Sequence, residues 1–561
     1  MGSTSIHDDL SYVIDEKALG TPRPVKVICI GAGTSGMNTA YQMQTHMKAF
    51  ELVIYEKNNA IGGTWLENTY PGVACDIPAH NYQFSWAPNP DWSEFYVSGP
   101  EILQYFQKTA ASFGMEKYLK LQHQITGAFW EEESSTWRVE VQNQVTGEKI
   151  EDRCDFLING TGFLNNWKWP DIRGLHSFKG DLLHTASWQT SANLKDKRVA
   201  VIGNGSLGMQ IVTAIYPDVK HLTTFIRNPT WVSTSFALQY AGPNGSSFKY
   251  TDEQKKEFKE DPEKFAKYRK ALDEEMSGRF DLMHKDSELQ GQARAYLTSV
   301  MRSRLGEDHP LVDKIIPNFG VGCRRSTPGL GYLETLAKQN VRLIDDGIAE
   351  VLPSGIKLNT GEFIEIDTLI CATGFDVSWK PRFPIVGRNG VNLRETWEGR
   401  PTGYLGLAVP DIPNYFLYMG PNSPLGHGSA IPAIEHVTKY ICRMIYKAQT
   451  ECYKSMAPSR KAVEEYIQHA DLYHERTVWS GNCVSWFKGG KDGPVIALTP
   501  GSRLHWFHLL KEPRFEDWEW RTSGSNRFAY LGNGYSTMEV EGKDKSWFLN
   551  DVNLGYETLI Y

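Results

Sequence analysis

The stretch Val27-Ile28-Cys29-Ile30-Gly31-Ala32-Gly33-Thr34-Ser35-Gly36 joins a short apolar run to a Gly-x-Gly-x-x-Gly loop. A second stretch of the same kind begins at Val199 and ends in the loop Gly203-Asn204-Gly205-Ser206-Leu207-Gly208. A buried strand that ends in such a loop and opens a helix is typical of a dinucleotide site, because N–H groups at the helix N-terminus face the pyrophosphate. One such loop is a weak signal, but two in one chain predict two dinucleotide sites.

The residue that follows the next strand differs in charge between the two copies. Leu52-Val53-Ile54-Tyr55 is followed by Glu56, whereas the run from Leu222 to Ile226 is followed by Arg227. An acid at this point accepts hydrogen bonds from a free ribose hydroxyl, and an arginine suits a 2′-phosphate. We therefore expect FAD at the first loop and NADPH at the second. The contacting loop residues would be Gly31, Gly33, Ser35 and Gly36 for FAD, and Gly203, Gly205, Ser206 and Gly208 for NADPH.

The two halves of the chain share a later pattern as well. The segment 155–163 matches 367–375, and each follows a Thr-Gly-Glu turn, at Thr146 and Thr360, between segments of alternating apolar and polar residues. Such alternation predicts antiparallel strands. The expected fold class is therefore α/β, with two Rossmann-like dinucleotide-binding domains (FAD and NADP), small β-meanders and a helical insertion in the NADP domain.

We expect the chain to divide into a lead over 1–24, a first part of the FAD-binding domain with a linker over 25–195, and an NADP-binding domain over 196–385. The C-terminal part, 386–561, would complete the FAD domain and wall the active site. The insertion, 240–315, is charged and helical in pattern. Thr251 with Gln254 predicts a capping box, and Asp261-Pro262 marks another helix start.

Composition excludes several classes of function. The net charge of −7 gives no support for binding to nucleic acid or to an anionic membrane, and no run of about 18 apolar residues predicts a membrane span. The eight cysteines are scattered without a close pair, so we expect a reducing compartment, a cytoplasmic location and no metal site. A disulfide reductase, which needs a redox-active cysteine pair, is disfavoured for the same reason.

Two further signatures lie near the loops. Gly62-Gly63-Thr64-Trp65 is followed by Tyr70-Pro71-Gly72 and Asp76, and later comes Phe178-x-Gly180-x-x-x-His184-x-x-x-Trp188. With these motifs, the chain from about residue 25 to about 540 resembles the type I Baeyer–Villiger monooxygenases, most of all fungal members that act in secondary metabolism. It departs from the family at Gln189, where the second signature ordinarily has Pro or Asp.

The resemblance implies an FAD- and NADPH-dependent enzyme that forms a C4a-peroxyflavin and inserts one oxygen atom from O2 beside a ketone carbonyl, giving an ester or lactone. Arg325 matches the family's active-site arginine, and Asp76 matches the carboxylate that holds it. An arginine suits this role because it stays charged at any working pH. The substrate would be a polyketide, terpenoid or steroid-like ketone, and the protein would be a monomer or weak homodimer.

Other residues take expected roles from the same resemblance. The FAD contacts would include Gly63, Thr64, Trp65, Asp76 and Tyr82, in addition to the first loop and Glu56. The NADP contacts would include Arg324, beside Arg227 on the 2′-phosphate, and Trp486 in a covering loop. Phe178, Gly180, His184 and Trp188 would form the hinge signature, with His184 coupling NADP binding to domain movement and not acting as a general base.

Three other functions remain open at this point. A flavin monooxygenase that hydroxylates nitrogen or sulfur shares both loops, but it lacks the pattern from Gly62 to Asp76 and needs no arginine at 325. An NADPH oxidase or reductase would need a second electron carrier or redox cysteines. A non-catalytic nucleotide sensor is hard to reconcile with Asp76 and Arg325 being present together.

Overall fold

A computed structural model describes residues 12–551. Its first sheet has the strand order β19-β7-β1-β2-β3, and every neighbouring pair is parallel. The central strand β1 is buried along nearly its whole length, as expected of a parallel sheet covered on both faces. The five strands are β1 (Val25–Ile30), β2 (Phe50–Tyr55), β3 (Leu119–Lys120), β7 (Phe156–Asn159) and β19 (Tyr415–Leu417).

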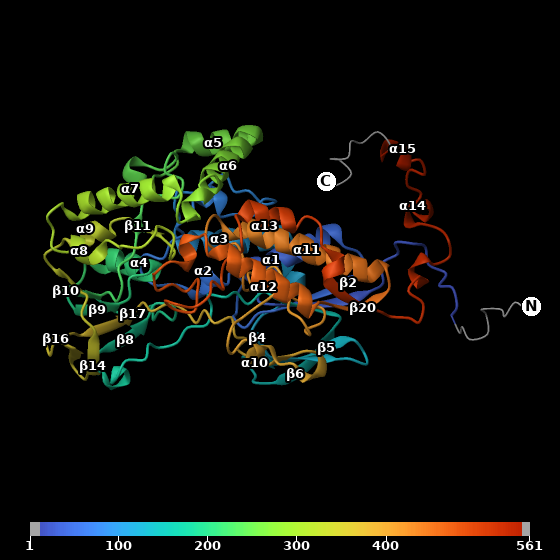
Figure 1. The fold of residues 1–561 in the computed structure, drawn as a ribbon, viewed down its shortest axis with the longest axis horizontal. Helices are drawn as coiled ribbons and strands as arrows, with labels where there is room; N and C mark the ends of the chain where they lie inside the picture. Colours follow the sequence, from blue (N-terminus) through green and yellow to red (C-terminus); the bar gives the residue numbers. More distant parts are fainter. Residues whose placement is uncertain (1–11, 552–561) are drawn as a thin grey trace, which may run out of the picture.

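The second sheet repeats this design with the order β13-β10-β9-β17-β8, again fully parallel. Figure 1 shows β8, β9, β10 and β17 at the left end of the molecule, apart from α1 and α11 near the middle and β2 to the right of them. Two parallel sheets, each with a nucleotide loop, are what the sequence predicts. The strands are β8 (Asp181–His184), β9 (Arg198–Ile202), β10 (His221–Phe225), β13 (Val341–Ile344) and β17 (Thr368–Cys371).

Each unit carries a small antiparallel meander, as predicted from the alternating segments. In both, the Thr-Gly-Glu turn places a glycine at positive φ, +74° at Gly147 and +91° at Gly361, a conformation that glycine adopts readily. The first meander has β4 (His123–Glu131), β5 (Thr136–Asn143) and β6 (Lys149–Cys154), joined by β18 (Ile385–Val386); the second has β14 (Ile348–Leu352), β15 (Gly355–Leu358) and β16 (Phe363–Glu365).

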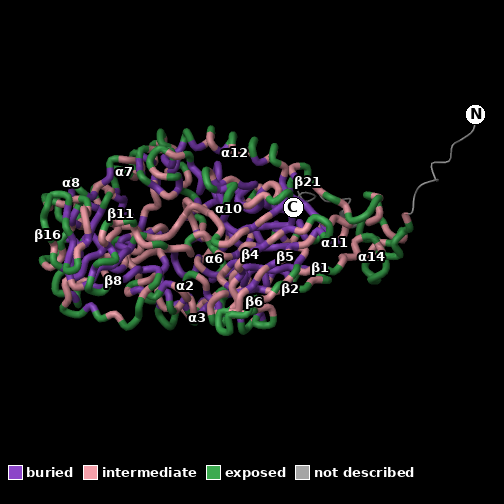
Figure 2. Tube along the Cα trace, turned by 90° about the horizontal axis from the view of Figure 1, so that it is seen from below, coloured by how far each residue is buried: buried purple, intermediate pink, exposed green. Residues whose placement is uncertain are grey.

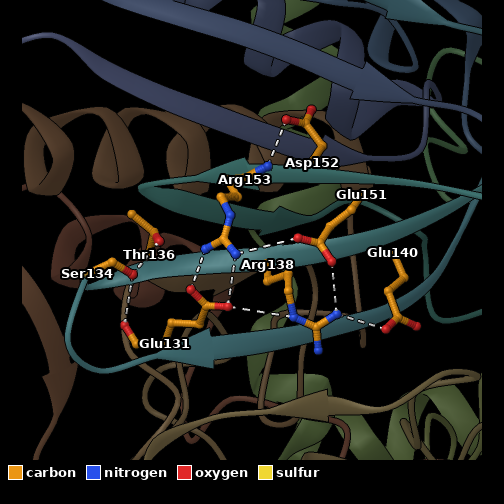
Figure 3. A network of polar contacts seen from close by, with 8 residues as sticks. All are labelled: Glu131, Ser134, Thr136, Arg138, Glu140, Glu151, Asp152 and Arg153. Carbon is orange, nitrogen blue, oxygen red and sulfur yellow. Dashed lines mark hydrogen bonds and ion pairs between the residues drawn. The ribbon is translucent and has the colours of Figure 1, made fainter.

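Charged side chains on the first meander form a cross-strand network (Figure 3). Arg138 donates to Glu140 at 2.9 Å and lies 3.4 Å from Glu151, while Arg153 contacts both Glu131 and Glu151. Opposite charges on neighbouring strands favour this strand register. Because the side chains are substantially exposed, each pair contributes only about 0–1 kcal/mol, and the network is a surface feature.

Helices cover both sheets. Helix α1 (Thr34–His46) opens at the first loop and packs on α11 (Ala430–Thr450), which comes from the C-terminal part of the chain. Helix α4 (Ser206–Ile215) opens at the second loop and packs on α9 (Tyr332–Leu336). The other helices and short strands are α2 (Thr64–Glu67), α3 (Gly99–Ser112), α8 (Val312–Ile315), α10 (Leu393–Thr396), α12 (Arg460–His474), α13 (Arg503–Leu509), α14 (Thr537–Val540), α15 (Phe548–Asp551), β11 (Val232–Ser233), β12 (Thr327–Pro328), β20 (Tyr453–Pro458) and β21 (Trp518–Thr522).

The predicted helical insertion contains α5 (Asp252–Glu260), α6 (Pro262–Ser277) and α7 (Glu288–Leu305). The capping box at Thr251 is present, since its side chain and that of Gln254 each accept from the other's backbone N–H. The Asp261 side chain caps α6. The apolar stripe of α6 packs around His80 of the first unit, with the Phe265 ring 5.2 Å from the imidazole. The insertion is thus a packed lobe that connects the two units.

Buried residues fill the interior between sheets and helices, whereas the α14 end is mostly exposed (Figure 2). Within residues 12–551, no helix combines the length and apolar character needed to cross a bilayer.

The cysteines depart from the expectation of scattered, unpaired thiols. Cys323 and Cys483 form a disulfide between residues 160 positions apart in the chain. No local spacing reveals such a pair, because it is created when the C-terminal segment folds back on the second unit. The remaining cysteines are unpaired: Cys29, Cys75, Cys154, Cys371, Cys442 and Cys452.

Candidate active site

The first nucleotide loop joins β1 to α1, and its glycines serve different purposes. Gly31 has a φ of +97°, which L side chains rarely adopt, so it turns the chain sharply out of the strand. A Cβ on Gly36 would lie 2.2 Å from the Gly31 carbonyl oxygen, so only glycine allows α1 to pack this close to β1. Gly33 faces Gly63, and Ser35 is buried in the first turn of α1. Bare backbone therefore surrounds the N-terminus of α1, as a pyrophosphate site requires.

Glu56 lies beside this loop, as the sequence predicts. Its carboxylate accepts a hydrogen bond from the Ala32 N–H at 2.8 Å and another from the Asn58 N–H at 2.9 Å. Both contacts hold the side chain in place, and it is only 5% exposed. Each carboxylate oxygen has a second lone pair, so the group retains acceptor capacity for a ribose hydroxyl.

In the second loop, Gly203 and Gly208 have the same structural roles as Gly31 and Gly36. The third glycine, Gly205, is required neither by the backbone conformation nor by packing within the chain. Gly203 has a φ of +116°, and a Cβ on Gly208 would lie 2.0 Å from the Gly203 carbonyl oxygen. Gly205 has an ordinary φ of −78°, and a Cβ there would meet no atom within 4 Å. Neither backbone conformation nor packing demands glycine at 205. Close approach of a bound group to the backbone would demand it, so these residues fit a dinucleotide.

A hydrogen bond connects this loop to the arginine pair. The Ser206 and Thr327 hydroxyl groups lie 2.8 Å apart, and Thr327 begins the short strand β12 just after Arg324 and Arg325. The second loop is therefore in direct contact with the segment that carries both arginines.

Arg227 and Arg324 lie close enough for their charges to repel, and Arg324 donates to the Pro229 carbonyl at 3.3 Å. Arg227 is exposed, Arg324 is half-buried, and neither forms an ion pair with any acidic residue in the part of the chain that the structure describes. Burial lowers the pKa of Arg324, and the charge of Arg227 lowers it further. Two close cations of this kind gain from a shared anion, in agreement with the expected 2′-phosphate site.

Arg325 and Asp76 form a bidentate ion pair, although they lie 249 residues apart in sequence. Nη1 donates to Oδ2 at 2.6 Å and Nη2 to Oδ1 at 3.0 Å. Burial alone would lower the pKa of Arg325, but the Asp76 carboxylate outweighs it and the pKa is raised. The Arg325 side chain is 31% exposed, so a permanently charged guanidinium is fixed in orientation and still reachable.

This ion pair lies where the two units meet. The Tyr70 hydroxyl donates to the Gln210 side chain at 2.6 Å, and Gln210 donates to the Ala74 carbonyl at 2.9 Å. Gly72 packs so closely on α4 that a Cβ there would lie 2.8 Å from the Ala214 Cβ. The segment that carries Asp76 is therefore seated on the helix that opens at the second loop.

The first signature also places aromatic groups beside the first loop. The Trp65 indole donates to the Tyr82 hydroxyl at 3.2 Å, and their rings meet edge to face. A Cβ on Gly63 would lie 3.0 Å from the Gly33 Cα, and the adjacent Thr64 is exposed at the start of α2. Gly63 thus lies against the first loop, and Trp65 and Tyr82 contact each other in the segment that follows; their contacts with FAD stay a prediction.

Trp486 contacts the first unit from the C-terminal segment. Its ring centroid lies 5.7 Å from that of Phe163, which in turn stacks on Trp379 at 5.9 Å. Phe163 follows the Thr161-Gly162 turn of the first closing strand. A covering position for Trp486 agrees with this placement, and its role toward NADP stays a prediction.

The hinge signature has a structural explanation at two positions. A Cβ on Gly180 would lie 2.7 Å from the Phe178 ring and 2.2 Å from the Asp367 carbonyl oxygen, so the aromatic ring lies directly over the glycine. Trp188 is half-buried against the core of the second unit, and Gln189 is exposed. The departure at 189 therefore leaves the packing unchanged.

His184 lies between the linker and the second closing strand, and its role in coupling NADP binding to domain movement stays a prediction. Its Nδ1 accepts from the Ala186 N–H at 3.1 Å, which places the proton on Nε2, 3.2 Å from the Thr373 hydroxyl. Its ring stacks on Trp167, and burial lowers the pKa of His184 to about 4. The imidazole is neutral and fully engaged between the linker and the second Thr-Gly turn, which agrees with excluding it as a general base.

Sequence reasoning did not find Phe236, Phe163 and Trp379. The Arg325 guanidinium lies 5.6 Å from the centroid of the Phe236 ring, close enough for a cation–π contact. Phe163 is the last residue of the duplicated segment 155–163, a signal that points to it. Phe236 and Trp379 belong to no motif, and only the folded arrangement places Phe236 beside Arg325 and Trp379 on Phe163.

Two nucleotide-type units joined by a bidentate arginine–aspartate pair define a two-cofactor flavoprotein. The model of the flavin-binding monooxygenase-like family matches residues 24–242. FAD-binding monooxygenase tazF of Aspergillus terreus is 41% identical over 93% of both chains. A Baeyer–Villiger monooxygenase of Streptomyces coelicolor is 30% identical over 85% of this chain and 89% of that protein.

Among solved structures, cyclohexanone monooxygenase from Rhodococcus sp. Phi1 bound to NADP+ superposes with a TM-score of 0.76 at 27% identity, covering 90% of this chain and all of that chain. The chain belongs to the flavin-binding monooxygenase-like family. It is an FAD-dependent monooxygenase, and the resemblance and fold class expected from the sequence are confirmed. FAD and NADPH, the expected cofactors, are those of this family.

Proposed function

We propose that the protein is a Baeyer–Villiger monooxygenase that inserts one oxygen atom from O2 beside the carbonyl of a small-molecule ketone and releases an ester or lactone. FAD, held by the first loop and Glu56, would supply the redox chemistry that couples NADPH oxidation to activation of O2; the family resemblance implies a C4a-peroxyflavin for this step. The observation that carries the proposal is the bidentate Arg325–Asp76 pair at the contact between the two nucleotide units.

Arg325 would stabilise negative charge on the ketone oxygen when the carbonyl is attacked. A preorganised cation in a partly buried site is worth far more than one in water, because it needs no reorientation as charge develops. Asp76 would hold the guanidinium by both N–H groups and prevent it from turning away. Phe236 lies against the Arg325 guanidinium and would help to hold it in place.

A cluster of three aromatic residues after the first closing strand favours a largely apolar ketone. Phe163, Trp379 and Trp486 gather next to the first unit, and aromatic walls with a few polar groups are typical of small-molecule pockets. A polyketide, terpenoid or steroid-like ketone suits these surroundings.

The expected domain division is also part of the proposal. Strand β19 and helix α11 both come after residue 386, yet β19 joins the first sheet and α11 packs on α1. This supports a C-terminal part that completes the FAD domain. A cytoplasmic location and a monomeric or weakly dimeric state remain predictions.

Replacing Arg227 with glutamine should reduce the preference for NADPH over NADH. Arg227 is exposed and has no acidic partner among the described residues, so its charge is available to a 2′-phosphate. Losing one charge-assisted contact is expected to raise the KM for NADPH by about 10- to 100-fold while leaving that for NADH unchanged. Steady-state NAD(P)H oxidation measures both constants.

The matched control is Arg173→Gln, which removes another exposed arginine that pairs with Glu350 on the second meander. It should leave both KM values at the wild-type level. An Arg227→Gln enzyme with undiminished preference for NADPH would show that this arginine does not contact the phosphate.

The reaction itself is tested with the FAD-loaded enzyme, NADPH and ¹⁸O2 on a panel of cyclic, aromatic and steroid-like ketones. The proposal expects at least one product that contains the ketone plus one ¹⁸O, as an ester or lactone by mass spectrometry and NMR. Only peroxide formation across the panel, or N- and S-oxides from amine and sulfide probes with no ester, would contradict it.

A further inference from the structure

The Cys323–Cys483 disulfide is the one covalent cross-link within the described residues. Its Cα atoms lie 6.3 Å apart, within the range that disulfides allow, and both residues are almost completely buried. None of the roles assigned above uses it.

The two cysteines are next to residues with assigned roles. Cys323 immediately precedes Arg324 and Arg325, and Cys483 is three residues before Trp486. Cys323 belongs to the second nucleotide unit, whereas Cys483 belongs to the C-terminal part. The bond therefore fastens the loop that carries both arginines to the segment that carries the covering tryptophan.

Packing around the bond holds the start of this segment closely. A Cβ on Gly481 would lie 3.4 Å from the Cys323 Sγ, and one on Gly322 would lie 2.8 Å from the Met283 Sδ. Lys488 donates from Nζ to the Gly481 carbonyl oxygen. The base of the segment is thus fixed on the arginine loop.

The far end of the segment is held less firmly. Cβ atoms on Gly489 and Gly490 would meet nothing within 4 Å, and the following Lys491 and Asp492 are exposed. Segments with few contacts open easily. Trp486 lies between Ser485 and Phe487, which are both buried, and the Phe487 carbonyl accepts from the N–H groups of residues 496 and 497. The disulfide and these contacts together set the position of Trp486.

We propose that the Cys323–Cys483 disulfide is a positioning tether. It holds the segment 483–492, which contains Trp486, over Arg324 and Arg325. This inference rests on the proposed function for what the segment covers, namely bound NADP and the oxygen-transfer site. Closing the bond removes two electrons and two protons from the two thiols; one molecule of hydrogen peroxide accepts them and becomes two molecules of water. A dithiol reductant reverses the step.

The first test counts thiols. Protein denatured without reductant and treated with an alkylating agent should show six modified cysteines of the eight in the chain, with a cross-linked peptide joining residues 323 and 483 by mass spectrometry. Eight modified cysteines in freshly purified protein would overturn the proposal.

The second test compares the Cys323→Ala/Cys483→Ala enzyme with wild type. Without the bond, trypsin should cleave after Lys491 on the order of tenfold faster than in wild type. NADP+ should bind several-fold more weakly, because less of the site is preorganised. Hydrogen peroxide released per NADPH should rise. The control is Cys154→Ala, which removes another buried cysteine from the first meander.

Trypsin cleavage and NADP+ affinity test the tether, whereas ester formation tests the proposed reaction, so the two proposals can fail independently. Faster cleavage and weaker NADP+ binding with no ester formed by any variant would leave the tether standing and remove the proposed reaction. Unchanged cleavage, NADP+ affinity and peroxide release in an ester-forming double variant would overturn the tether. If the double variant fails to fold, wild type opened by a dithiol and reclosed by peroxide provides the same comparison.

Discussion

Ester formation by the Arg325→Ala enzyme should fall by about 10³-fold or more, whereas reduction of bound flavin by NADPH should continue. The guanidinium is the permanent cation that Asp76 holds at the contact between the two units, and losing one preorganised group that stabilises transition-state charge typically costs 10²- to 10³-fold. Here the lost group carries a full charge in a partly buried position, so the loss should lie at the upper end. Stopped-flow flavin reduction and product quantification measure the two steps separately.

Two further variants test whether geometry matters as well as charge. Arg325→Lys keeps a cation but cannot make the bidentate contacts at 2.6 and 3.0 Å, so it should recover only a small part of the activity. Asp76→Asn keeps the size of the side chain and removes its charge, and an intermediate loss is expected. The control Arg342→Ala breaks the exposed Arg342–Glu362 pair and should leave the product yield unchanged. Substantial ester formation by Arg325→Ala would contradict the role assigned to Arg325.

The sequence predicted those parts of the site that follow from local backbone chemistry. Gly31 and Gly203 turn the chain at positive φ, and Gly36 and Gly208 allow close packing of helix on strand. These conformational and packing requirements involve residues that are close in sequence, so they produce a recognisable spacing of glycines. The closing strands and meanders were predicted for the same reason.

Contacts between distant segments were harder to predict. The Arg325–Asp76 pair, 249 residues apart, was expected only through the resemblance to a family, because no local pattern joins an arginine to an aspartate on another unit. The Cys323–Cys483 bond and the packing of Phe236 on Arg325 were missed altogether. Each depends on how the C-terminal part and the insertion fold back, which is a property of the tertiary structure.

The Gly205→Asp variant should fold as well as wild type and yet bind NADPH at least about 10²-fold more weakly. Residue 205 is the N-cap of α4, with a φ of −78° and open space where a Cβ would point. Aspartate is a preferred N-cap and its charge favours the helix N-terminus, so the free energy of unfolding should stay level or rise. The same carboxylate would repel a pyrophosphate at that position.

Gly208→Ala should give the opposite result. Its Cβ would lie 2.0 Å from the Gly203 carbonyl oxygen, so α4 must shift from β9, at an expected cost of about 3 kcal/mol in the free energy of unfolding. Urea denaturation and the KM for NADPH, measured on both variants, distinguish a glycine that is needed for packing from one that is needed for binding the pyrophosphate. Undiminished NADPH binding by Gly205→Asp would mean that the pyrophosphate does not approach residue 205. The absence of a side chain there would then have no explanation in either packing or binding.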